Sequence, residues 1–198
     1  MLIYNLENSS FFEAQQIEIC AKTSINKLKL RTKMQEKFYQ TNSVEETYLF
    51  GEALGRCLVA GDVLALAGEL GAGKTTITHG IAQGLGITSP ISSPTFTLLF
   101  EHPAGTENLP LFHFDAYRLT DETEWYDAGF MEYFDNQGVV IIEWADKIKN
   151  VLPQTAKWLH ITTNLAQPEQ RVFRLSIEYD SDFNWENLTA WELCKNLL

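Results

Sequence analysis

Residues 68–75 read GELGAGKT, and this stretch decides the fold. It matches the G-x-x-x-x-G-K-[ST] pattern of a P-loop without a gap. The apolar residues 62–67 before it predict a short buried strand, and residues 75–85 predict a helix that Gly86 ends. A strand before and a helix after the glycine-rich turn is the context that the motif requires. The stretch therefore predicts an α/β fold of the P-loop NTPase type.

Each residue type in the motif suits the binding of a polyphosphate. Gly71 and Gly73 lack a Cβ atom, so the backbone can curl and present its N–H groups to phosphate oxygens. The helix that begins near Thr75 directs its positive dipole end at the same place. The Lys74 ammonium can reach the β- and γ-phosphates, and the Thr75 hydroxyl can ligate Mg²⁺. A turn that binds nothing would not need these two residues, so we expect ATP and Mg²⁺ as ligands and ATP hydrolysis as the activity.

Catalysis in P-loop proteins also needs a carboxylate near the metal, at the end of an apolar strand. Two residues qualify, Asp115 and Glu143. Because Glu143 ends the more apolar strand, we assign it to Mg²⁺, directly or through water. Asp115 then orients or deprotonates the attacking water. Two alternatives stay open: the reverse assignment, and a helix-capping role for one of the two carboxylates.

A polar loop is predicted over residues 91–97, between the P-loop helix and the next strand. Many P-loop hydrolases place a loop that senses the γ-phosphate at this point in the chain. The hydroxyl groups of Ser93, Thr95 and Thr97 could reach a phosphate or a metal. An ordinary polar loop is the alternative reading of the same residues.

Three more side chains near these motifs allow a functional or a structural interpretation. Trp144 directly follows the predicted metal carboxylate and could pack on the nucleotide, at a partner surface or in the core. His79 and His113 have no second ligand at metal spacing, so we expect both to be structural.

Other segments show the periodicity of helices and strands. Ser43 and Glu46 fit a capping box, which predicts a helix over residues 44–59 that Gly61 ends. The remaining predicted elements are strands over residues 96–101, 111–117 and 139–142, an antiparallel strand pair over residues 158–164 and 172–179, and helices over residues 121–130 and near the C-terminus.

The charge distribution predicts two regions. Residues 1–42 carry six Lys and Arg against four Asp and Glu, whereas the whole chain has a net charge of −11. This contrast suggests a boundary near Asn42, with an N-terminal extension of uncertain order over residues 1–42 and a P-loop ATPase domain over residues 43–198. Met34 is a second possible start just ahead of the periodic pattern.

Composition argues against several classes of protein. Of the 198 residues, 45% are apolar, which suits a hydrophobic core, and the acidic balance disfavours autonomous DNA binding. The chain has no stretch of about 18 apolar residues and no secretory signal pattern, so we expect no membrane association. Cys20, Cys57 and Cys194 are far apart and predict reduced thiols in a cytoplasmic protein, not a disulfide framework or a zinc site.

Four segments together resemble the TsaE (YjeE) family, the bacterial ATPases of tRNA threonylcarbamoyladenosine biosynthesis. The segments, in order, are GELGAGKTT at residues 68–76, SPTFTL at 93–98, HFDAYRL at 113–119 and IEW at 142–144. The match covers roughly residues 43–179. Residues 1–42 are extra relative to the family, and Glu69 stands where Asp is common.

The resemblance implies a compact P-loop sandwich with a mixed, partly antiparallel central sheet. It also implies a weak ATPase that acts with the partner proteins TsaB and TsaD. That complex places the threonylcarbamoyl group on adenosine 37 of tRNAs that read ANN codons. The family member does not carry out the transfer; its cycle of ATP binding and hydrolysis resets or activates the complex, which contacts the tRNA through the partners.

Carried over by position, the resemblance assigns individual roles. Lys74 and Asp115 are catalytic, and Thr75 and Glu143 hold Mg²⁺. The residues assigned to nucleotide binding are Glu45, Leu70, Gly71, Ala72, Gly73, Lys74, Thr75, Thr76, Trp144 and Arg171.

Three rival functions differ in their sequence requirements. A small-molecule kinase usually closes an Arg-rich lid over its acceptor, but only Arg118, Arg171 and Arg174 follow the P-loop. A GTPase needs an [NT]-K-x-D signature, and residues 26–29, NKLK, lack the aspartate. A regulatory module that binds ATP without needing turnover stays open, because the binding and hydrolytic residues are separable.

Overall fold

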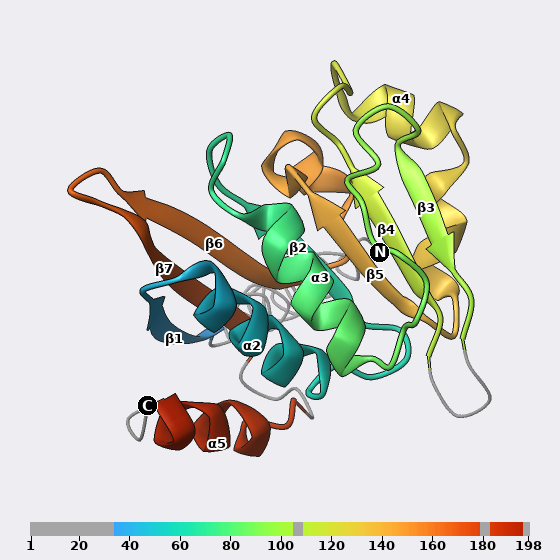
Figure 1. The fold of residues 1–198 in the computed structure, drawn as a ribbon. Helices are drawn as coiled ribbons and strands as arrows, with labels where there is room; N and C mark the ends of the chain where they lie inside the picture. Colours follow the sequence, from blue (N-terminus) through green and yellow to red (C-terminus); the bar gives the residue numbers. More distant parts are fainter. Residues whose placement is uncertain (1–33, 105–108, 179–182, 196–198) are drawn as a thin grey trace, which may run out of the picture. The chain divides into compact units, whose positions relative to one another are not determined.

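A mixed β-sheet organises the computed structural model, which describes residues 34–104, 109–178 and 183–195 (Figure 1). Within these residues the sheet has seven strands in the order β1-β7-β6-β2-β5-β4-β3. The strands are β1 Met34–Thr41, β2 Val63–Ala67, β3 Leu99–His102, β4 Leu111–Asp115, β5 Val139–Glu143, β6 Lys157–Asn164 and β7 Gln167–Glu178. The helices are α2 Val44–Gly55, α3 Lys74–Gly84, α4 Glu122–Asp127 and α5 Glu186–Lys195, with 3₁₀ segments η1 Phe130–Asp135 and η2 Ala145–Val151.

The strands at the centre of the sheet pair in parallel, and the strands toward its two edges pair antiparallel. Strand β2 is parallel to both β5 and β6, and β4 is parallel to β5. The pairs β1–β7, β6–β7 and β3–β4 are antiparallel. The predicted α/β fold with a mixed, partly antiparallel sheet is therefore confirmed.

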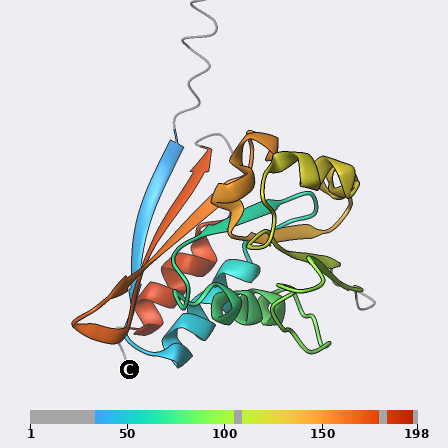
Figure 2. The ribbon, with the colours of Figure 1, turned by 90° about the horizontal axis from the view of Figure 1, so that it is seen from above.

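Two hydrophobic clusters cover opposite faces of this sheet. Along β5, Val139 and Ile141 belong to the cluster beneath α2 and α3, while Val140 and Ile142 belong to the other. This alternation follows from the two-residue period of a strand. Figure 2 shows α2, α3 and α5 on one side of the sheet and α4 with the 3₁₀ segments on the other. The carboxyl ends of the parallel strands stay uncovered by either layer, next to the start of α3.

Glycines let α2 and α3 pack with almost no space between their backbones. A Cβ atom added at Gly80 of α3 would lie 2.1 Å from the carbonyl oxygen of Tyr48 in α2. One added at Gly55 would lie 2.3 Å from the carbonyl oxygen of Ile81. Any side chain at these positions would push the helices apart, so this contact fixes where the N-terminus of α3 lies.

Several predicted boundaries are wrong by a few residues. Helix α2 ends at Gly55, not at Val59, because the amides of Cys57 and Leu58 bond three residues back and turn the chain toward β2. The predicted helix over residues 121–130 is shorter, since Asp121 is the N-cap of α4 and η1 follows as a separate segment.

Strands β3 and β4 are also shorter than expected. Strand β3 begins at Leu99, not at Phe96, because the amides of Thr97 and Leu98 both bond the carbonyl oxygen of Pro94 and close a turn. Strand β4 ends at Asp115, whose side chain accepts a hydrogen bond from the amide of Tyr117 and bends the chain away. The antiparallel pair β6–β7 and helix α5 are present as predicted, but β7 begins at Gln167, five residues before the predicted start at residue 172.

The sheet starts before the predicted boundary at Asn42. Strand β1 pairs along its whole length with β7, and its Tyr39 and Thr41 are buried. Residues 34–41 therefore belong to the sheet and not to an extension.

Residues 1–33 and Tyr179 lie outside the described residues, as does the side chain of Cys194. Cys57 is a buried free thiol. No helix among the residues that the structure describes is long and apolar enough to cross a membrane.

Replacing Gly80 with alanine is expected to lower the free energy of unfolding by about 1–3 kcal/mol, because the new methyl group meets backbone and not a movable side chain. Urea unfolding of the purified chain measures this change. The exposed Gln83 of the same helix gives a matched control, since Gln83→Ala should change stability by no more than about 0.5 kcal/mol. Equal stability of the two variants would contradict close helix packing at Gly80.

Candidate functional site

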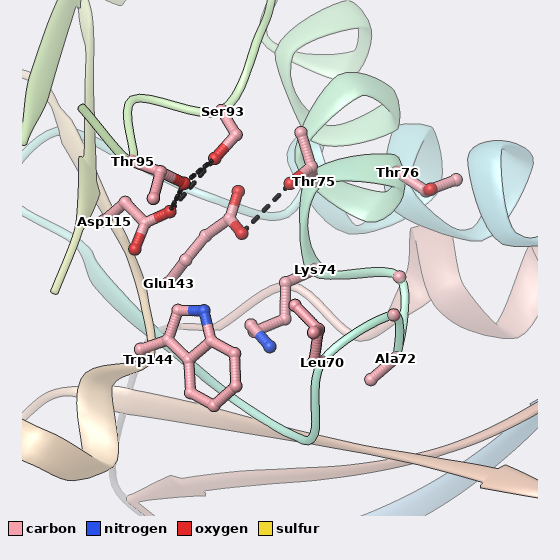
Figure 3. Close-up of a pocket in the computed structure, with 12 residues that line it drawn as sticks. Leu70, Ala72, Lys74, Thr75, Thr76, Ser93, Thr95, Asp115, Glu143 and Trp144 are labelled. Carbon is pink, nitrogen blue, oxygen red and sulfur yellow. Dashed lines mark hydrogen bonds between the residues drawn. The ribbon is translucent and has the colours of Figure 1, made fainter. Parts of the chain in front are cut away.

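A pocket of about 250 Å³ opens where β2, β4 and β5 end and α3 begins (Figure 3). Ten of the residues predicted for the site line it. They are Leu70, Gly71, Ala72, Gly73, Lys74, Thr75, Thr76, Asp115, Glu143 and Trp144. The roles assigned to them stay predictions, but the fold brings them together from three separate parts of the chain.

The P-loop backbone adopts conformations that favour glycine. Gly71 has a φ of 76° and Gly73 a φ of 103°, both in the left-handed region. Gly73 is also the N-cap of α3, so the first helical amides open toward the pocket. A loop of this kind concentrates N–H dipoles at a helix N-terminus, which is an arrangement suited to binding an anion.

Lys74 is buried inside the loop. Its Nζ donates hydrogen bonds to the carbonyl oxygens of Gly68 at 2.7 Å and Glu69 at 3.0 Å. The ammonium also lies 3.6 Å from the centre of the Trp144 ring. Burial lowers the pKa of Lys74, and the nearby carboxylate of Glu143 opposes this shift. The lysine is thus a partly desolvated cation, which gains most from a close anion.

The Thr75 hydroxyl contacts the carboxylate at the end of β5. Thr75 Oγ1 donates to Glu143 Oε2 at 3.0 Å, and Glu143 Oε1 lies 2.9 Å from His113 Nε2. Glu143 and His113 are both buried. His113 was predicted to be only structural, yet the fold places it against the predicted metal carboxylate.

The loop before β3 contacts the second carboxylate. Asp115 Oδ2 accepts hydrogen bonds from Ser93 Oγ at 3.0 Å and from the Thr95 hydroxyl, and Oδ1 accepts one from the amide of Tyr117 at 2.9 Å. Ser93 and Thr95 also bond each other at 2.6 Å. Both line the pocket, although neither was assigned a role in binding; the SPT motif was their signal in the sequence.

Trp144 forms a wall of the pocket and is not a core residue. Its backbone is left-handed, with a φ of 58°, and its ring packs on Tyr117 at 5.0 Å between centres. One edge of the pocket is therefore aromatic, with the Lys74 ammonium against its face. Such a wall can pack against a ligand or a partner group that enters the pocket.

Two residues predicted to bind nucleotide do not line the pocket. Glu45 is exposed in the first turn of α2. Arg171, on β7, contacts the P-loop from outside the pocket. Its Nε donates a hydrogen bond to the carbonyl oxygen of Ala72 at 2.8 Å, and one of its terminal nitrogens lies 3.5 Å from the carbonyl oxygen of Gly71. These bonds connect the P-loop to β7, so we expect Arg171 to stabilise the loop. His79 is exposed on α3, as a structural or surface residue would be.

The oxygen donors of the pocket suit a hard cation. Thr75, Glu143 and Asp115 offer one hydroxyl and two carboxylates, which are the ligand types that Mg²⁺ prefers. Among the described residues no group of three or more His, Cys, Asp or Glu side chains could hold a metal ion by itself. This pattern fits Mg²⁺, which usually takes one or two protein ligands and completes its shell with phosphate and water.

Comparison with known proteins gives a consistent set of relatives. The family model described as threonylcarbamoyl adenosine biosynthesis protein TsaE matches residues 41–173. The tRNA threonylcarbamoyladenosine biosynthesis protein TsaE of Bacillus subtilis is 48% identical over 121 residues, which cover 61% of this chain and 74% of that protein. The protein of the same name from Treponema pallidum is 40% identical over 114 residues, or 58% of this chain and 82% of that protein.

A solved structure also matches the fold. The crystal structure of Bacillus subtilis YdiB superposes with a TM-score of 0.62 and 33% sequence identity. The superposition covers 83% of this chain and 95% of that one, so the likeness extends far beyond a single motif.

Replacing Arg171 with glutamine should lower the free energy of unfolding by about 1–2 kcal/mol, because the P-loop carbonyls lose a charged donor. Urea unfolding measures the loss. Arg174 on the same strand is the control: it forms a partly exposed pair with Glu36 at 3.7 Å, and Arg174→Gln should cost no more than about 0.5 kcal/mol. Identical unfolding curves for the two variants would show that Arg171 does not brace the loop.

Proposed function

The chain belongs to the TsaE family, whose proteins take part in threonylcarbamoyladenosine biosynthesis in tRNA, and we propose that it serves this pathway as a Mg²⁺-dependent ATPase. The hydrogen bond between Thr75 and Glu143 is the observation that carries the proposal. It joins the last residue of the P-loop motif to a strand-end carboxylate, which is the pairing that holds Mg²⁺ in P-loop NTPases. A turn that binds phosphate without a metal would not require that pairing.

Each group in the pocket then has a task. The P-loop amides and the Lys74 ammonium bind the phosphates, and Thr75 with Glu143 hold the metal. Bound Mg²⁺ would neutralise negative charge on the β- and γ-phosphates. Asp115 lies across the pocket mouth with its carboxylate fixed by three donors, where it can orient a water molecule and accept its proton.

The same features support a role in a complex and not in group transfer. We assign the pocket groups to phosphate, metal and water, so this proposal gives none of them a role in carrying a threonylcarbamoyl group. The net charge of −11 disfavours direct binding to tRNA, so we infer that partner proteins of the TsaB and TsaD type hold the RNA. A cytoplasmic location, where tRNA is modified, is part of this proposal.

Replacing Lys74 with alanine should weaken ATP binding about 10- to 100-fold, because the phosphates lose a charge-assisted donor within the loop. Isothermal titration calorimetry with Mg²⁺ and ATP measures the change. Lys149 is exposed on η2 outside the pocket, so Lys149→Ala is a charge-matched control that should bind ATP like the native chain. ATP affinity that is unchanged in Lys74→Ala would refute the phosphate site.

Asp115→Asn should keep ATP affinity within about threefold but slow hydrolysis by about 10²- to 10⁴-fold, because the amide cannot accept the proton of water. Phosphate release under single-turnover conditions measures the rate. Asp127→Asn, at the exposed end of α4, is the control and should hydrolyse ATP normally.

The same variant separates an ATPase from a regulatory module. Native chain, TsaB, TsaD, tRNA, ATP and an activated threonylcarbamoyl donor together should modify the tRNA, and the rate of ATP hydrolysis should rise above that of the chain alone. If Asp115→Asn binds ATP, fails to hydrolyse it and still supports repeated rounds of modification, then binding alone suffices. In that case the hydrolytic part of the proposal is wrong.

A further inference from the structure

His113 lies fully buried on β4, directly beside the predicted metal carboxylate. Its side chain has no exposed surface and that of Glu143 is 3% exposed, with 2.9 Å between Nε2 and Oε1. In the parallel pair β4–β5, His113 stands opposite Ile141, one two-residue step before Glu143. Both side chains therefore project from the same face of the sheet, and the Glu143 side chain spans the step between them.

The hydrogen bonds around this pair define the form of the imidazole ring. Glu143 Oε2, on the pocket side, accepts a hydrogen bond from the Thr75 hydroxyl. Oε1, on the other side, is also an acceptor and therefore needs a donor from His113. A proton on Nδ1 alone would set the Nε2 lone pair against Oε1. Nδ1 has no hydrogen-bond partner among the described residues. A proton on Nε2 is therefore the one that satisfies the carboxylate.

We propose that His113 is a positioning residue, whose Nε2–H holds Oε1 of Glu143 so that Oε2 faces Thr75 at the metal position. This inference rests on the proposed function for the identity of the metal site, but the hydrogen bond itself does not. Residues that orient a metal-binding carboxylate from behind commonly tune metal affinity.

The unpaired Nδ1 shows why packing alone does not explain a histidine here. The neighbours of His113 along β4 are Leu111, Phe112 and Phe114, all buried and apolar. A leucine would fill such a layer without burying an unsatisfied nitrogen. His102 on the adjacent strand also has one unpaired ring nitrogen, Nε2, but its Nδ1 bonds Ser89 Oγ at 2.8 Å and not a pocket carboxylate.

Three substitutions of His113 distinguish the effect of its Nε2–H donor from the effect of its ring volume. In His113→Gln the amide nitrogen reaches the place of Nε2, in His113→Asn it reaches only that of Nδ1, and His113→Leu has no donor. Electron paramagnetic resonance of Mn²⁺, a probe for Mg²⁺, gives the metal affinity in the presence of ADP. Leucine and asparagine should weaken Mn²⁺ binding about 10- to 100-fold, and glutamine should restore it to within about threefold of native.

Two controls isolate the metal position. ADP affinity measured in excess chelator should be the same in all four proteins, because His113 does not line the pocket. His102→Leu removes a comparable buried ring from the adjacent strand and should leave Mn²⁺ affinity unchanged. Native-like Mn²⁺ binding by His113→Leu, or equal losses in the leucine and glutamine variants, would overturn the positioning role.

A measurement on the native chain guards against variants that do not fold. Long-range ¹H–¹⁵N spectra of the His113 ring should show a proton on Nε2, as the hydrogen bond to Glu143 requires; a proton on Nδ1 alone would overturn the inference. If the native chain binds no Mn²⁺ with ADP, the proposed function fails, and these spectra alone decide whether His113 holds the Glu143 carboxylate.

Discussion

The hydrogen bond from Thr75 to Glu143 depends on the parallel pairing of β2 with β5. These residues are 68 positions apart, and they meet because Leu66 stands opposite Glu143 in the sheet. The P-loop follows β2 immediately, so α3 begins at the edge where β5 delivers its carboxylate. A shift of one residue in this register would turn Glu143 to the opposite face of the sheet. The register of β2 and β5 therefore determines that the Glu143 carboxylate lies at the start of α3.

The parts around this bond are held with different rigidity. Glycines hold the backbone of helix α3 directly against that of α2. Arg171 fastens the outer side of the P-loop to β7. The loop that carries Ser93 and Thr95 is attached to the pocket through hydroxyl bonds to Asp115. A phosphate that competes for those hydroxyls would change this loop before it changed the P-loop.

Sequence reasoning located the P-loop and both carboxylates because each signal is contiguous: a spaced motif, or an acidic residue that ends an apolar run. Strand β1 was missed because it is an edge strand, with Tyr39 and Thr41 buried among polar residues, so its alternation is weak. The start of β3 was misplaced because Leu98 has a left-handed backbone conformation, with a φ of 65°. Leucine rarely adopts this conformation, so the sequence gives no sign of it. The role of His113 was missed because its partner is 30 positions away and only pairing of β4 with β5 joins them.

The balance of charge in the pocket supports the proposal that nucleotide and metal bind together. Lys74 supplies an ammonium group to the pocket lining, and Asp115 and Glu143 supply two carboxylates near it. A bare triphosphate would bring several negative charges against these two, with one buried cation to offset them. In the proposed function a divalent cation would supply positive charge beside the phosphates, and the phosphates would complete its ligand shell. On this proposal, His113 keeps the Glu143 carboxylate directed at the position where the two would meet.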